Sequence, residues 1–187
     1  MNSFFNDPSP ADAGDFSWRE TPLPGDAEKI KKLVRSSGFF SPEEVAIAAE
    51  LVEERLTRGV QSGYFFLFAD EGETLVGYSC YGPIPGTRSS YDLYWIAVDE
   101  RYRGHGVGKR LLFRTEAIIR RMRGSRIYVE TSSRDQYAPT RAFYEHTGYI
   151  QAAFLRDFYS PGDGKIIFVK ENGDESFSIP DSRIATF

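Results

Sequence analysis

The stretch that most constrains the fold runs from residue 98 to residue 112 and reads VDERYRGHGVGKRLL. Before it, Tyr91 to Val98 predicts a β-strand, and after it the apolar residues between Gly106 and Met122 recur at helical spacing. A glycine has no Cβ atom, so a turn with alternate glycines lets backbone N–H groups approach a ligand closely. A helix N-terminus adds positive potential, so we expect a phosphate-binding turn around Gly104, Gly106 and Gly108.

Charge is concentrated around the same turn. Residues 101–126 contain nine basic side chains and one acidic side chain, which gives this segment a charge of +8. The whole chain carries −4, so the remainder carries −12. A broadly acidic surface opposes binding to nucleic acid, so the local charge favours a small phosphate-bearing ligand.

Two common phosphate-binding motifs fail at this turn. A P-loop needs a glycine where Arg103 stands, and a serine or threonine after Lys109, where Arg110 stands. A dinucleotide fingerprint needs the spacing G-x-G-x-x-G, which the three alternate glycines do not have. A magnesium-dependent nucleotide site is therefore disfavoured.

The periodicity of the whole chain predicts one α+β domain around a mixed sheet. Ser41 to Glu44 has the features of a helix start, and the helix is expected to end at Gly59. The chain of 187 residues is 41% apolar, enough for one sizeable core. We expect a flexible N-terminus over residues 1–14, the domain over residues 15–170, and a C-terminal extension of uncertain structure over residues 171–187. The other predicted elements are strands at 16–19, 64–69, 74–81, 127–131, 149–158 and 165–170 and helices at 26–35 and 137–146.

Cysteine and histidine are scarce. One cysteine, Cys80, excludes an intramolecular disulfide, and His105 and His146 are too few and too far apart to suggest a metal site. We expect Cys80 to be a buried thiol rather than an acyl carrier. With no signal-like or membrane-spanning run, the sequence predicts a cytoplasmic protein with no metal and no membrane partner.

The glycine turn carries the pattern R-x-x-G-x-G, here Arg103, Gly106 and Gly108. Downstream, residues 142–149 read AFYEHTGY, which matches the pattern F-Y-x-x-x-G-[FY]. With a predicted strand between them, the two motifs resemble the GNAT family of N-acetyltransferases over about residues 16–170. The resemblance implies a mostly antiparallel sheet of six to seven strands, about four helices and a splayed central strand pair.

The resemblance also implies the ligand and the residues that bind it. In this family the turn holds the pyrophosphate of acetyl-CoA, a cosubstrate, and the pantetheine follows the splayed strand. A backbone N–H near Val98 is expected to stabilise the tetrahedral oxyanion. The implied coenzyme-binding residues are Ile96, Ala97, Val98, Arg103, Gly104, His105, Gly106, Val107, Gly108, Lys109 and Gln136. Gln136 is included because Tyr137 stands where the family often has an asparagine that bonds the pantetheine.

Three residues are candidates for catalysis. Tyr144 matches the family's general acid, although a purely packing role beside Phe143 is the alternative. Asp92 precedes Val98 by six residues, so simple alternation would put it on the same strand face as Ile96 and Val98, whereas a strand bulge, which is common in this family, would alter the facing. It matches the strand carboxylate that acts as a base in one branch of the family, with Glu130 on the neighbouring strand as its competitor. An ammonium anchor or a structural role for Asp92 stays open.

The acceptor is not readable from the sequence. A small amino-acid-like amine and a peptide or protein amine both fit, and a homodimer is left open. We expect the acceptor side to include Phe39, Phe40, Tyr81, Arg88, Tyr91, Tyr94, Phe158 and Tyr159. The competing function is a coenzyme-A-binding sensor or interaction module that lacks turnover.

Overall fold

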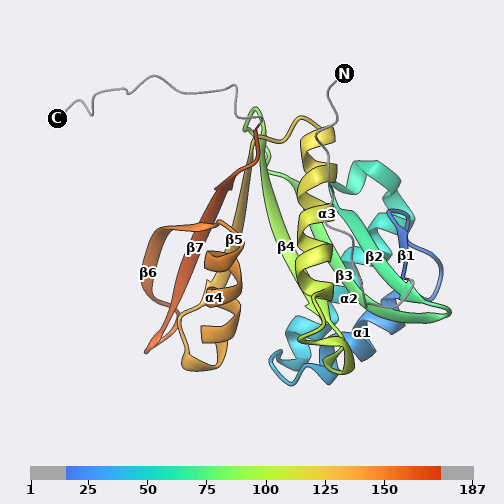
Figure 1. Cartoon of the computed structure of the whole chain (residues 1–187), viewed down its shortest axis with the longest axis horizontal. Helices are drawn as coiled ribbons and strands as arrows, with labels where there is room; N and C mark the ends of the chain where they lie inside the picture. Colours follow the sequence, from blue (N-terminus) through green and yellow to red (C-terminus); the bar gives the residue numbers. More distant parts are fainter. Residues whose placement is uncertain (1–15, 174–187) are drawn as a thin grey trace, which may run out of the picture.

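The computed structural model describes residues 16–173. Within this range seven strands form one open sheet, and four α-helices lie on its faces (Figure 1). The strands are β1 (Ser17–Arg19), β2 (Phe65–Glu71), β3 (Thr74–Pro83), β4 (Ser90–Val98), β5 (Arg126–Ser132), β6 (Ile150–Ser160) and β7 (Asp163–Glu171). The α-helices are α1 (Asp26–Ser36), α2 (Pro42–Arg58), α3 (Val107–Arg121) and α4 (Ala138–His146).

These elements confirm the predicted fold class, a GNAT-type α+β fold, and most predicted boundaries agree within two or three residues. The expected N-terminus, 1–14, and most of the expected extension, 171–187, lie outside the described residues. Three short 3₁₀ turns were not predicted: η1 (Gly59–Ser62), η2 (Glu100–Tyr102) and η3 (Asp135–Tyr137). No helix in residues 16–173 is long and apolar enough to cross a membrane.

The start of α2 follows directly from local sequence. The Ser41 hydroxyl accepts a hydrogen bond from the Glu44 backbone N–H, and the Glu44 carboxylate accepts one from the Ser41 N–H. This reciprocal capping box satisfies two backbone donors that the first helical turn leaves free. It fixes the loop between α1 and α2, which becomes one wall of the cavity described below.

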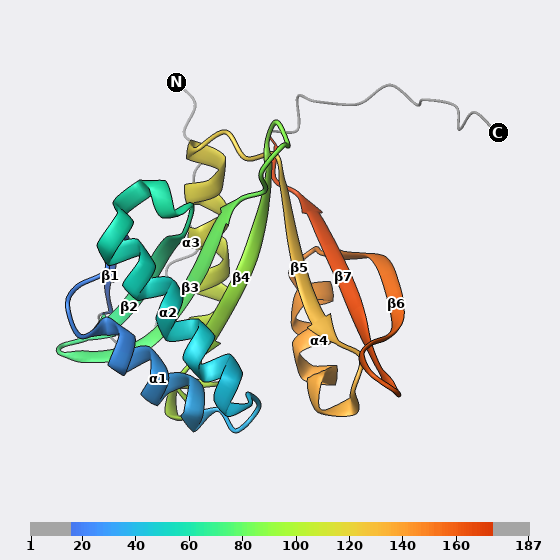
Figure 2. The same ribbon diagram turned by 180° about the vertical axis from the view of Figure 1, so that it is seen from behind.

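The sheet has the order β1-β2-β3-β4-β5-β7-β6, and all neighbours are antiparallel except β4 and β5. In Figure 2, α1 and α2 lie in front of the first four strands, with α3 and α4 behind the sheet. Two cores result. One joins α1 and α2 to β2 and β3, and the other joins α3 and α4 to the opposite face of the whole sheet.

The parallel pair β4–β5 parts soon after it begins. Three residue pairs connect the two strands, from Ser90 with Arg126 to Asp92 with Tyr128. Beyond Asp92 the strands diverge, as Figures 1 and 2 show. The predicted splayed pair is therefore present.

A β-bulge in β4 accompanies the parting. Cys80 of β3 pairs with Trp95, but the next residue, Tyr81, pairs with Leu93, so Tyr94 is an extra residue. A bulge of this kind reverses which face later side chains occupy. Leu93 and Ile96 consequently contact the same core, the one under α3 and α4. The expectation that Asp92 shares a face with Ile96 and Val98 is wrong for this reason.

A partly buried ion pair ties α3 to the far side of the parted sheet. The ammonium of Lys170 on β7 donates to both carboxylate oxygens of Glu116 on α3, at 3.0 and 2.8 Å, and to the Thr147 carbonyl. The amide of Asn172 donates to the Glu116 carbonyl. Because α3 also packs on β3 and β4, these contacts hold the two parts of the sheet together.

We predict that Lys170→Met lowers the free energy of unfolding by roughly 2–4 kcal/mol, because it leaves the buried Glu116 carboxylate without its partner. Urea unfolding at pH 7 measures the change. The control is Lys31→Met, which removes a partner of the exposed carboxylate of Glu28 and should have a much smaller effect, because solvent screens that ion pair. Equal effects of the two substitutions would contradict a clamping role.

Candidate active site

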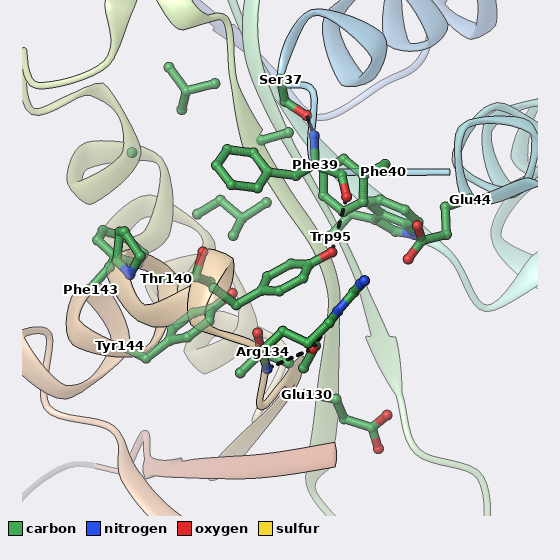
Figure 3. A pocket seen from close by; sticks show the side chains of 18 of the residues that line it. Ser37, Phe39, Phe40, Glu44, Trp95, Glu130, Arg134, Thr140, Phe143 and Tyr144 are labelled. Carbon is green, nitrogen blue, oxygen red and sulfur yellow. Dashed lines mark hydrogen bonds between the residues drawn. The ribbon is translucent and has the colours of Figure 1, made fainter. Parts of the chain in front are cut away.

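A cavity of about 760 Å³ lies where β4 and β5 have parted. Its walls come from both parts of the sheet, from the α1–α2 loop, and from the beginnings of α3 and α4. Figure 3 shows Phe143 and Tyr144 on the α4 side, and Phe40 and Trp95 across from them. This is the position where the sequence motifs predicted a ligand.

The edge of β4 forms one wall, from Tyr94 to Val98. The Asp99 N–H bonds to the Val76 carbonyl on β3 at 2.8 Å. Successive residues of a strand direct their backbone groups to opposite sides, so the N–H of Val98 points away from β3, toward the gap. Among the described residues, β4 has no strand partner on that side after Asp92. The strand therefore offers free backbone donors and acceptors to the cavity.

The glycine turn lies at one end of the cavity. Arg103 and Gly108 line it, whereas Val107 is buried in the core below. Gly106 is the N-cap of α3, with a φ of 76° that favours glycine, and no side chain caps the helix. The first turn of α3 has no acidic residue, so its free N–H groups face no competing carboxylate. Other predicted coenzyme residues are exposed around the turn without lining the cavity: Gly104, His105, Gly106 and Lys109.

Tyr144 reaches the cavity from α4, together with Pro139, Thr140 and Phe143. It is buried and packs against Tyr149 and Phe168. Burial raises the pKa of Tyr144, so its phenol keeps its proton at neutral pH. Tyr144 therefore has the ring contacts expected of a packing residue and also the access to the cavity expected of a general acid.

The two candidate carboxylates differ in position. Glu130 lines the cavity and forms an ion pair with Lys165 at 2.6 Å. Asp92 lies half-buried on β4, behind the cavity lining. Its pKa is raised, first by burial and then by the negative charge of Glu130, against an opposing effect of Lys165. The three side chains therefore form one electrostatic group on the side of the sheet opposite α3.

The cavity also contains polar residues that the sequence did not single out. The Ser132 hydroxyl donates to Asp163 at 2.5 Å, and Asp163 pairs with Arg134 at 3.0 Å. The Tyr137 hydroxyl donates to the Phe39 carbonyl at 3.2 Å across the gap. Tyr137 lines the cavity, so the residue that departs from the family pattern does contribute to the wall. Gln136, the expected substitute, is exposed and does not line it.

The residues expected on the acceptor side divide into two groups. Four line the cavity: Phe39, Phe40, Tyr94 and Tyr159. Phe158, next to Tyr159, is exposed and does not line it. Tyr81 and Tyr91 instead belong to the core under α3, because their strand positions face that helix. Arg88 lies on the β3–β4 loop, whose residues are absent from the cavity wall. Cys80 is buried, as expected, and burial raises its thiol pKa well above the ordinary value.

An open sheet that parts at one parallel pair, with a glycine turn and a helix N-terminus at the gap, defines the class of N-acetyltransferase folds. The profile of the Acetyltransferase (GNAT) family matches residues 30–149. The chain belongs to this family.

Individual relatives agree with this assignment. N-alpha-acetyltransferase RimI of Mycobacterium tuberculosis is 29% identical over 113 residues, which cover 59% of this chain and 68% of RimI. A protein from Desulfovibrio desulfuricans, described as an acetyltransferase of the GNAT family, has a TM-score of 0.83 and 44% identity over 84% of this chain and 99% of its own. An aminoglycoside 6′-N-acetyltransferase complexed with coenzyme A has a TM-score of 0.69 and 22% identity, covering 88% of this chain and 99% of its own, which shows a shared fold.

We predict that Asp92→Asn makes the protein more stable at pH 7. Burial raises the folded pKa of Asp92 above the unfolded value, so the wild-type protein loses stability as pH rises through that interval. The neutral amide has no such loss, so the difference should shrink toward pH 3.

Thermal unfolding at pH 7 and pH 4 measures this effect. Asp99→Asn is the comparison variant, and its effect on stability should have the opposite sign, because a hydrogen bond from Arg101 lowers the pKa of Asp99. The ionised Asp99 contributes stability above its unfolded pKa, and this contribution is lost as pH falls through its folded pKa. An Asp92→Asn variant that is no more stable than wild type at pH 7 would contradict the account of Asp92.

Proposed function

We propose that this protein transfers the acetyl group of acetyl-CoA to a primary amine by direct attack in a ternary complex. The observation that carries the proposal is that Tyr144, the unpaired edge of β4 and the start of α3 line one cavity. Family membership supports the reaction class. The relatives' names, which include an N-alpha-acetyltransferase, support an amine acceptor.

The coenzyme would bind with its phosphates at the turn before α3. The residues there fit an anion: backbone N–H groups free of side-chain caps, glycines that leave space, and Arg103 beside the cavity. The pantetheine would follow β4, whose backbone faces the gap at Ile96 and Val98. Tyr137 would supply the polar side chain that the family's asparagine usually supplies.

The chemistry needs three groups. The neutral amine nitrogen attacks the thioester carbonyl carbon, and the Val98 N–H is directed to stabilise the resulting oxyanion. As the carbon–sulfur bond breaks, Tyr144 donates its proton to the departing thiolate. The amine's excess proton passes, directly or through water, to a carboxylate. Glu130 lines the cavity wall, and Asp92 lies close enough to interact with Glu130.

The alternative of a coenzyme-A-binding module without turnover remains as the second candidate. Coenzyme binding without turnover requires neither a protonated tyrosine inside the cavity nor a carboxylate pair on the side opposite the coenzyme turn. The presence of both favours the enzyme. A thiol-release assay with acetyl-CoA and a panel of amines separates the two functions.

We predict that Gly108→Glu abolishes coenzyme binding and leaves the fold intact. A Cβ atom at Gly108 would meet its neighbours at ordinary contact distances, and an acidic residue suits the first turn of a helix. The added carboxylate would repel phosphates. Gly106 is a poorer test position, because its positive φ makes any side chain strained.

Calorimetric titration with coenzyme A and a thermal unfolding curve measure the two effects. Gly108→Ala is the matched control and should bind the coenzyme within a few-fold of wild type, since it adds a Cβ but no charge. Undiminished affinity in folded Gly108→Glu would remove the turn from the site.

We predict that Tyr144→Phe lowers kcat about a hundredfold, at the low end for general acid catalysis, with little change in coenzyme affinity. The substitution removes the proton donor and keeps the ring contacts with Tyr149 and Phe168. Tyr149→Phe removes a neighbouring buried hydroxyl that does not line the cavity, and should keep most of the turnover. Single-turnover kinetics isolates the chemical step. If that step is as fast in Tyr144→Phe as in wild type, Tyr144 is a packing residue.

A further inference from the structure

Within residues 16–173, no helix covers one face of the C-terminal part of the sheet. In Figure 2, α1 and α2 lie in front of the first four strands, while β5, β7 and β6 face the viewer uncovered. Their other face is covered, because α4 and its core lie there. The uncovered face is on the same side of the sheet as Glu130 and Lys165.

Apolar side chains form a strip along this face. Leu155 pairs with Lys165, and Ile150 pairs with Val169, so strand alternation puts both on the uncovered face. They are strongly exposed, at 42% for Leu155 and 68% for Ile150. Phe158 and Tyr159 extend the strip and are each about half exposed. An exposed apolar strip of this kind marks an interaction surface.

The strip is continuous with the mouth of the cavity. Tyr159 lines the cavity itself. The Lys165 ammonium lies 3.8 Å from the centre of the Phe158 ring and 2.6 Å from the Glu130 carboxylate, which also lines the cavity. A molecule whose amine reaches Glu130 therefore passes directly onto Phe158 and then Leu155.

The backbone beside the strip is also free to bind. β6 is the outer strand of the sheet, and its pairing with β7 is interrupted between Leu155 and Ser160. An edge strand offers a row of unpaired N–H and C=O groups to an extended chain. Side-chain contacts and backbone hydrogen bonds are thus available along the same line.

We propose that the acceptor is a polypeptide, whose amine enters the cavity while the following residues lie extended over the strip formed by Tyr159, Phe158, Leu155 and Ile150. This inference rests on the proposed acetyl transfer and deepens it. The carboxylate of Glu130 at the cavity wall, with that of Asp92 close enough to Glu130 to interact with it, suits the arriving ammonium. A small amine would leave the strip bare, and a second copy of the chain seated on it would cover the mouth that the acceptor must enter.

The dimensions give the expected length of the acceptor segment. Ile150 and Leu155 pair with Val169 and Lys165, which are four residues apart on β7, because β6 has a bulge between Gln151 and Ala153. The distance between them is therefore about 14 Å of strand. An extended peptide needs about five residues to cover that distance, in addition to those that enter the cavity. The contacts should therefore be complete at about eight residues.

The test compares acceptors that share one first residue and contain no lysine, from the single amino-acid amide to an eight-residue peptide. Thiol release with acetyl-CoA should show kcat/KM rising with length and levelling near eight residues. Leu155→Ser and Ile150→Ser should each lower kcat/KM about fivefold for the longest peptide, with no comparable loss for the amide.

Two matched controls lie at the end of α2, with Leu56 in the helix and Val60 in η1, over the first strands of the sheet and away from β6. Leu56 is 41% exposed and Val60 is 65% exposed, so Leu56→Ser and Val60→Ser remove similar exposed apolar groups away from the strip. They should leave both acceptors unaffected. A second eight-residue peptide, with a blocked N-terminus and one internal lysine, tests whether the reacting group is a side-chain amine or a terminal amine. The proposal is supported if either peptide reacts and its kcat/KM falls in Leu155→Ser and Ile150→Ser.

Three results would overturn the proposal. The first is an equal kcat/KM for the amide and all peptides, which would leave the proposed acetyl transfer standing. The second is a loss in Leu155→Ser that is equal for amide and peptide. The third is a dimer, measured by sedimentation velocity, that dissociates in Leu155→Ser with unchanged peptide kinetics, which would assign the strip to a second copy. Transfer to none of the amines, by contrast, would overturn the proposed function itself.

Discussion

The site depends on the parting of β4 and β5 after three parallel pairs. A strand inside a sheet satisfies its backbone groups on both sides, but β4 after Asp92 is paired on the β3 side alone within the described structure. Leaving a buried polar group unpaired costs about 1–3 kcal/mol, so such an edge must meet water or a ligand. The cavity beside it therefore suits a chain-like molecule with its own donors and acceptors, and the residues proposed to react lie around it.

A parted sheet needs contacts that keep its two parts in place. At the closed end, the backbone N–H of Ser125 donates to the Ser89 carbonyl, and the backbone N–H of Asn172 donates to the Ser125 carbonyl. Further along, the Glu116–Lys170 pair connects α3 to β7. At the open end the Tyr137 hydroxyl reaches across to the Phe39 carbonyl, in a partly exposed position. The backbone bonds at the closed end and the Glu116–Lys170 pair hold the angle between the two parts, and the Tyr137–Phe39 contact lies at the proposed ligand site.

Local signals predicted most of the elements but not the register of β4. The capping box at Ser41, the helical spacing in α3 and the alternation in the strands are properties of neighbouring residues, so they can be read from the sequence. The bulge at Tyr94 depends on how β3 pairs with β4, and no local pattern marks it. This single extra residue explains why Asp92 was expected on the wrong face. The ring of Tyr137 and the Ser132–Asp163–Arg134 group belong to the site through tertiary contacts, which sequence spacing does not reveal.

The composition of the cavity bears on whether the proposed acetyl transfer is direct or passes through a covalent intermediate on the protein. A covalent route needs a nucleophile with an adjacent base. Among the described residues that line the cavity there is neither cysteine nor histidine, and the Ser132 hydroxyl donates to a carboxylate that is already paired with Arg134. Cys80 lies in the core against α1 and α2, and burial holds its thiol protonated. The positively charged turn of α3 and the carboxylates near Glu130 instead occupy different sides of the gap, so donor and acceptor can be bound together and react across it.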